Sequence, residues 1–152
     1  MTRTFFTLLA VFAASVAVLG STPVHAGTVD WAAAKAAFDE GADPANAPTS
    51  EKAFAYCAAF WTAWNDAARA GKVPPEAGTQ VNPTLVAPKV GHMRLQWQTW
   101  IELGDDPAAS AAYFQQASPA VTLQVAKALT GDGPALQAVM PALGACKLPD
   151  QG

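Results

Sequence analysis

The sequence has 152 residues, of which 51% are hydrophobic and 14% charged, and its nine Lys and Arg against twelve Asp and Glu give a net charge of −3. The mild acidity and the lack of a basic cluster exclude a nucleic-acid partner and a basic helix on a membrane surface. Two cysteines and two histidines also leave few residues for a metal site.

The first 26 residues have the pattern of a secretory signal peptide. Arg3 supplies the positive charge, residues 5–19 form an apolar run, and Val24-His25-Ala26 matches the motif that signal peptidase cleaves. The apolar run is shorter than the roughly 20 residues that a membrane anchor needs. We expect cleavage after Ala26, which leaves one soluble domain, residues 27–152, in the periplasm or outside the cell, without a membrane association.

The mature sequence predicts an all-α fold. Alanine, the strongest helix former, is its commonest residue, whereas isoleucine occurs once, at Ile101. No stretch shows the alternating pattern of a half-buried strand. We expect a compact bundle of about five to six helices, of which the second and third are the two long central helices.

Start and stop signals predict six helices. A capping residue or a proline opens each of them, and glycine follows several of their ends. The predicted helices span residues 29–40, 49–70, 83–103, 106–117, 118–130 and 132–145. The start of the third is uncertain between Pro83 and Pro88, and Pro141 predicts a kink in the sixth. The intervening loops are residues 41–48 and the longer, Pro-rich 71–82.

The second and third predicted helices each carry a Trp-x-x-Trp pair. At about 100° per residue, each pair lies on an apolar face of its helix. The paired residues are Trp61 with Trp64 and Trp97 with Trp100. We expect the two faces to pack against each other and to bury all four rings, as core residues rather than as a ligand-binding box.

Cys57 and Cys146 are the only two cysteines. An even number of cysteines in an exported protein predicts a disulfide, which would attach the carboxyl-terminal end of the domain to the second helix. The alternative is two unpaired buried thiols. Because the two are far apart in the sequence and form no Cys-x-x-Cys motif, we expect no thioredoxin-like redox role.

No catalytic, metal-binding or cofactor-binding motif is present. His92 is the one histidine after Ala26, which excludes zinc sites that need two histidines. There is no covalent haem motif, no Gly-x-Ser-x-Gly elbow and no phosphate-binding glycine loop. Asp105-Asp106 is interpreted as a helix cap, as is Ser118, rather than as part of a site. We therefore predict no cofactor and no metal.

The third predicted helix carries a candidate binding surface. His92, Gln96, Thr99 and Glu102 share its polar face, opposite the Trp pair. Polar groups on a rigid helix can present a fixed set of donors and acceptors, and the loop 71–82 would flank them. The alternative is a solvated face, the usual setting of a lone histidine.

These features favour an exported, non-enzymatic helical module that binds a protein or a small molecule. A first alternative is an enzyme whose site assembles only in three dimensions around His92, with Glu102, Asp66 or residues of the loop 71–82. A second alternative is a structural or stress-related exported protein. A concave polar pocket around His92 would favour the enzyme, and a large apolar surface would favour a protein partner.

Overall fold

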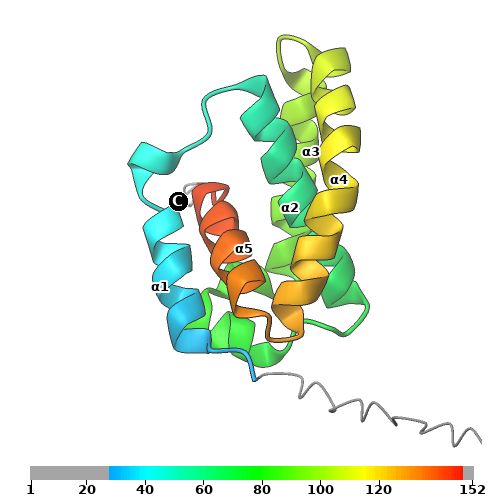
Figure 1. The fold of residues 1–152 in the computed structure, drawn as a ribbon. Helices are drawn as coiled ribbons and strands as arrows, with labels where there is room; N and C mark the ends of the chain where they lie inside the picture. Colours follow the sequence, from blue (N-terminus) through cyan, green and yellow to red (C-terminus); the bar gives the residue numbers. More distant parts are fainter. Residues whose placement is uncertain (1–27, 149–152) are drawn as a thin grey trace, which may run out of the picture.

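A computed structural model describes residues 28–148, so the predicted signal peptide and its cleavage site lie outside the described residues. The described chain forms five α-helices and three short helical turns, with no strand (Figure 1). The helices are α1 (Trp31–Gly41), α2 (Glu51–Arg69), α3 (Lys89–Leu103), α4 (Pro107–Leu129) and α5 (Gly133–Ala145). The turns are η1 (Pro44–Asn46), η2 (Ala77–Val81) and η3 (Pro83–Leu85). The all-α helical bundle is confirmed.

Four of the helices begin at a residue with a capping side chain. In each, a side-chain oxygen accepts a hydrogen bond from the backbone N–H three residues later, which satisfies a donor that the helix leaves free. The caps are Asp30, Ser50, Asp106 and Asp132. The exception is α3, which follows Pro88 without a side-chain cap. The loops 41–48 and 71–82 contain the turns η1 and η2, which the sequence did not predict.

The prediction of two separate helices over residues 106–130 is wrong, because α4 continues through Pro119. Instead of capping a new helix, the Ser118 hydroxyl donates to the carbonyl of Phe114 in the preceding turn, at 2.6 Å. Burial explains the continuity, since the apolar residues on both sides of the proline keep helical spacing and face the core. They are Ala117, Val121, Val125 and Ala128. With 23 residues, α4 is the longest described helix, and it packs along α2.

The bundle has two parts, with α1 against α5 on one side and α2, α3 and α4 on the other (Figure 1). Glycines allow the close approach of α1 and α5. A Cβ atom at Gly144 would lie 2.1 Å from the carbonyl oxygen of Phe38, and one at Gly41 would lie 2.0 Å from that of Pro141.

Like Pro119, Pro141 lies within a helix without ending it. No helix within residues 28–148 has the length and apolar character needed to cross a membrane.

Three of the four paired tryptophans are buried as predicted, and the fourth is not. Trp61, Trp64 and Trp97 are enclosed, but Trp100 is 49% exposed. The buried residues of α3 are Val90, Met93 and Trp97, and Trp100 lies only about 20° from Met93 around the helix. The prediction for Trp100 is wrong because Trp100 lies near the end of α3, beside Glu51 and Phe54 at the start of α2, where α2 covers only part of its ring.

The Cys57–Cys146 disulfide is present and joins α2 to the residue after α5. Both cysteines are buried. The indole N–H groups of Trp61 and Trp97 both donate to the backbone carbonyl of Cys146, at 2.9 and 2.7 Å. The third buried indole, that of Trp64, donates to the carbonyl of Leu85 at 2.9 Å. Covalent and hydrogen bonds therefore converge on one point, where the carboxyl-terminal end meets the bundle.

Candidate functional site

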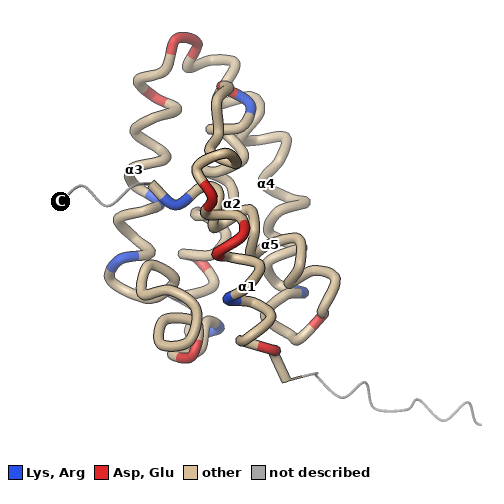
Figure 2. The backbone as a smooth tube through the Cα atoms, turned by 90° about the vertical axis from the view of Figure 1, so that its left-hand side faces the viewer, with Lys and Arg blue, Asp and Glu red and all other residues tan. Residues whose placement is uncertain are grey.

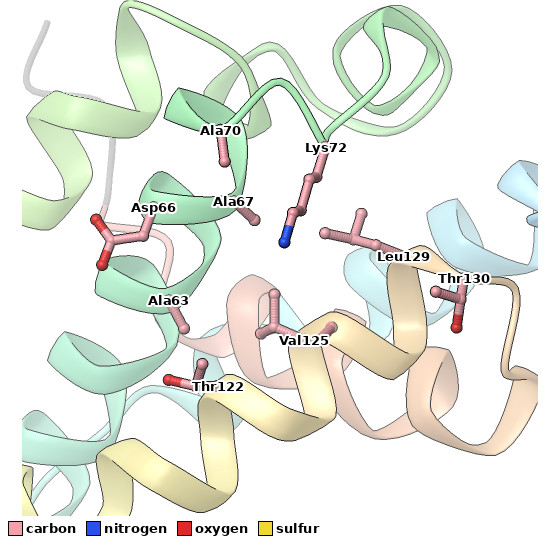
Figure 3. A pocket seen from close by; sticks show the side chains of 10 residues that line it. Ala63, Asp66, Ala67, Ala70, Lys72, Thr122, Val125, Leu129 and Thr130 are labelled. Atoms are coloured by element: carbon pink, nitrogen blue, oxygen red, sulfur yellow. The ribbon is translucent and has the colours of Figure 1, made fainter.

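A groove of about 550 Å³ lies between the carboxyl-terminal halves of α2 and α4 (Figure 3). Most of its lining is apolar, and its polar groups lie toward the edges. Residues 63–72 contribute Ala63, Asp66, Ala67, Ala70 and Lys72, and the opposite wall consists of Thr122, Val125, Ala126, Leu129 and Thr130. Two regular helices, joined through the same core, thus form both walls.

The groove is hollow because its α2 wall consists mainly of alanine. Ala63, Ala67 and Ala70 recur at the spacing that places residues on one side of a helix. Their methyl groups are too short to fill the space opposite Val125 and Leu129. Ala63 and Val125 are buried and form the floor, whereas Ala70 is exposed at the rim. The result is an apolar surface that no side chain of the described residues covers completely.

The end of α2 positions the one cationic residue of the groove. Gly71 has a φ of +70°, and its N–H donates to the carbonyl of Ala68 at 3.0 Å, while the N–H of Lys72 donates to that of Ala67 at 2.9 Å. These two bonds define a Schellman motif, in which the residue after the glycine packs back on the last turn. Lys72 occupies that position, so its ammonium points into the space between Ala67 and Leu129 (Figure 3).

The ammonium of Lys72 has no hydrogen bond or ion pair with any of the residues 28–148. Asp66 is the only acidic residue in the lining, but its carboxylate accepts from the side chain of Asn65 at 3.4 Å and points away from Lys72 (Figure 3). The opposite helix contributes little charge, since Lys127 is the single charged residue of α4 (Figure 2). The groove therefore combines an apolar floor with an unpaired positive charge.

A second hollow, of about 760 Å³, is larger but lies more open to solvent. It is formed by the end of α2 and the segments around η2 and η3, and none of its lining residues is charged. The lining residues are Ala68, Val73, Pro75, Gly78, Thr79, Pro83, Val86 and Ala87. We favour the groove between α2 and α4 because two helices hold its walls and because it contains a charged group that can orient a ligand.

The structure places all four residues of the predicted binding surface on the outward side of α3. His92, Gln96, Thr99 and Glu102 are exposed. Two leucines share this side with them, Leu95 at 52% and Leu103 at 79% exposure, so the face is mixed rather than polar. The loop 71–82 was expected to flank this surface, but its helical turn, η2, contacts α1 and η3.

The three side chains proposed for an enzyme site do not form a hydrogen-bonded group. The side chains of His92 and Glu102 have no hydrogen bond or ion pair with another described residue. The carboxylate of Asp66 accepts a hydrogen bond from the side chain of Asn65. Residues 28–148 contain no group of three or more His, Cys, Asp or Glu residues that could hold a metal ion.

A partly buried polar contact between α2 and the start of α4 is structural. Glu51, in the first turn of α2, accepts hydrogen bonds from the hydroxyl of Ser110 and from the backbone N–H of Asp106, the latter at 3.2 Å. Ser110 is almost completely buried. The contact holds the turn between α3 and α4 against the start of α2 and satisfies the polar groups involved.

Sequence reasoning did not find the groove, although two signals for it are present. The alanines at positions 63, 67 and 70 form a line of small residues on one side of α2. Lys72 directly follows the glycine that ends the helix, at the position where a Schellman motif usually has an apolar residue.

Comparison of the chain with protein-family models, curated proteins and solved structures gives no match.

Proposed function

We propose that the protein is an exported, non-enzymatic binding module that holds a small, largely apolar molecule in the groove between α2 and α4. Export is supported by the signal-peptide pattern and by the disulfide, because disulfides persist mainly in oxidising compartments. The groove volume of about 550 Å³ is within the range of about 300–1,000 Å³ that is typical of small-molecule sites.

The observation that carries this proposal is the uncovered apolar surface on the groove walls between two fixed helices, at Ala67, Ala70, Ala126 and Leu129. Water in contact with these walls raises the free energy, and a bound apolar ligand would recover about 25 cal/mol per Å² of covered surface. The walls need little rearrangement, since α2 is held by the disulfide and α4 packs along it. A preformed site of this kind loses little conformational entropy when a ligand binds.

Filling the groove should abolish binding of an apolar probe. Ala126 lies in the α4 wall and is exposed, so Ala126→Phe would place a ring in the groove without disturbing the core. We expect this variant to bind the uncharged dye N-phenyl-1-naphthylamine at least about tenfold more weakly, a loss of about 1.4 kcal/mol. Fluorescence titration measures the affinity, and the melting temperature should stay close to that of the parent.

The matched control is Ala120→Phe, which adds the same ring to an exposed position of α4 outside the groove. This variant should bind the dye like the parent. Equal binding by the parent and Ala126→Phe, or an equal loss in both variants, would show that the dye does not occupy the groove.

A second candidate function is binding of a second copy of this protein on the outward side of α3. Leu95 and Leu103 are exposed there, and Leu103 lines a small hollow together with the half-exposed Trp100. The two leucines lie at equal distances before and after Thr99 in the sequence. In a two-fold interface with an antiparallel second copy, Leu95 of each copy would therefore contact Leu103 of the other. A monomer in sedimentation velocity at high protein concentration would rule out this candidate.

A further inference from the structure

We infer that the ligand of the groove is a single-chain amphiphile with an anionic headgroup, for which a medium-chain carboxylate is the model compound. This inference rests on the proposed function, because it assigns the ligand class of the same groove. Lys72 would contact the headgroup, and the alanine-lined floor would take the chain.

The ammonium of Lys72 provides a binding partner for an anionic headgroup. It points into the groove, lacks an anionic partner among residues 28–148, and has apolar side chains on both sides (Figure 3). Lys72 is exposed to solvent, so an ion pair with an anion would have the modest strength of an exposed pair. An anionic headgroup at this place would complete an ion pair that the protein itself leaves open.

The carbonyl groups at the ends of the two helices do not replace such an anion. A helix carboxyl terminus is negative and attracts lysine, which could by itself account for Lys72. However, the carbonyls of Ala67 and Ala68 accept from the backbone of Lys72 and Gly71, and those of Lys127 and Ala128 accept from Asp132 and Gly131. The ammonium of Lys72 donates to no carbonyl at either helix end, so it still lacks a direct acceptor.

The length of the α2 wall fits a linear ligand. Between Ala63 and Ala70, the α2 wall extends over about 10 Å at 1.5 Å per residue, the extended length of an alkyl chain of about eight carbons. Lys72 lies at one end of this wall, beyond the last turn of the helix. A headgroup at Lys72 would therefore let a linear chain run along the floor toward Ala63.

The test compares three ten-carbon probes that differ only in the headgroup: decanoate, decanol and decylammonium. Each is titrated below its aggregation limit against the full protein, with displacement of N-phenyl-1-naphthylamine as the readout. The decisive quantity is the ratio of decanoate affinity to decanol affinity, because it cancels the contribution of the alkyl chain. We expect added salt to lower this ratio without changing the affinity for decanol.

Lys72→Met keeps the aliphatic stem but removes the charge. It should lower the decanoate-to-decanol ratio about fivefold, the upper part of the range that exposed ion pairs reach, and should improve binding of decylammonium. Lys72→Arg retains the charge and should keep the ratio of the parent. Lys127→Met is the matched control, since it removes one positive charge from α4 outside the groove lining and should leave the ratio unchanged.

The outcomes separate this inference from the proposed function. If neither the dye nor any of the three probes binds, the groove is not a binding site and both proposals fail. If the dye and decanol bind but the ratio is the same in the parent and Lys72→Met, the groove binds apolar molecules without selecting anions. In that case, only the assignment of an anionic ligand is wrong.

Discussion

Replacing Trp61 by alanine should lower the free energy of unfolding by about 3–5 kcal/mol. The Trp61 side chain is completely buried in α2, and its indole N–H donates to the carbonyl of Cys146 at 2.9 Å. The substitution would leave a large cavity and remove one of the two hydrogen bonds that this carbonyl accepts from tryptophans. Urea denaturation followed by circular dichroism measures the change.

Trp100→Ala is the matched control, because it removes the same side chain from a half-exposed position. Its ring contacts Phe54 edge-on, with the centroids 5.6 Å apart, and Trp97 at 5.9 Å. We expect a loss of about 1 kcal/mol, the scale of such aromatic contacts. Equal losses in the two variants would show that the core does not lie where the structure places it.

Removing the disulfide should have an effect of similar size. The double variant Cys57→Ala with Cys146→Ala should lose about 2–5 kcal/mol of stability. The bond joins residues 89 positions apart and so restricts the unfolded chain strongly. It also holds the carbonyl to which Trp61 and Trp97 donate. Thermal unfolding without reductant, compared with that of the parent before and after reduction, measures the loss.

The double variant should keep the helical content of the parent at low temperature, because the helices have their own caps and packing. Two results would contradict the expected role of the bond. If the variant and the parent melt at the same temperature, packing and hydrogen bonds alone hold the carboxyl-terminal end. If reduction leaves the melting of the parent unchanged, the bond does not form in the folded protein.

Four helix starts and the disulfide were predictable because they depend on local chemistry and on residue counts. Asp30, Ser50, Asp106 and Asp132 each precede a run of helix-forming residues, and a capping side chain there satisfies a free donor whatever the surrounding fold. The two cysteines left a single possible intramolecular pairing.

Pro119 and Trp100 were predicted wrongly because tertiary packing determines their roles. Locally, Ser118-Pro119 is a helix start, but burial of the residues on both sides keeps the chain in one helix. Trp100 is on the apolar side of α3 by helical angle, but the partners of α3 cover only part of that side. Neither outcome follows from the spacing of residues along one helix.

The groove could not be predicted because it depends on how two helices lie relative to each other. Ala63 and Ala67 look like ordinary helix residues until α4 is seen to leave the space beside them open. Likewise, Lys72 is an ordinary loop lysine until the turn at Gly71 directs it over the end of α2. The predicted surface on α3 used periodicity alone, which indicates the side of a helix but not a cavity.

The central claim, that the groove between α2 and α4 binds a ligand, is tested most directly by chemical-shift mapping. The ¹⁵N-labelled protein is titrated with decanoate, and the changes in amide resonances are placed on the structure. We predict saturable changes that concentrate at Ala63, Ala67, Lys72 and Val125, with little change on the outward side of α3. Changes confined to the region of Leu95 and Leu103, or no saturable change at all, would contradict the claim.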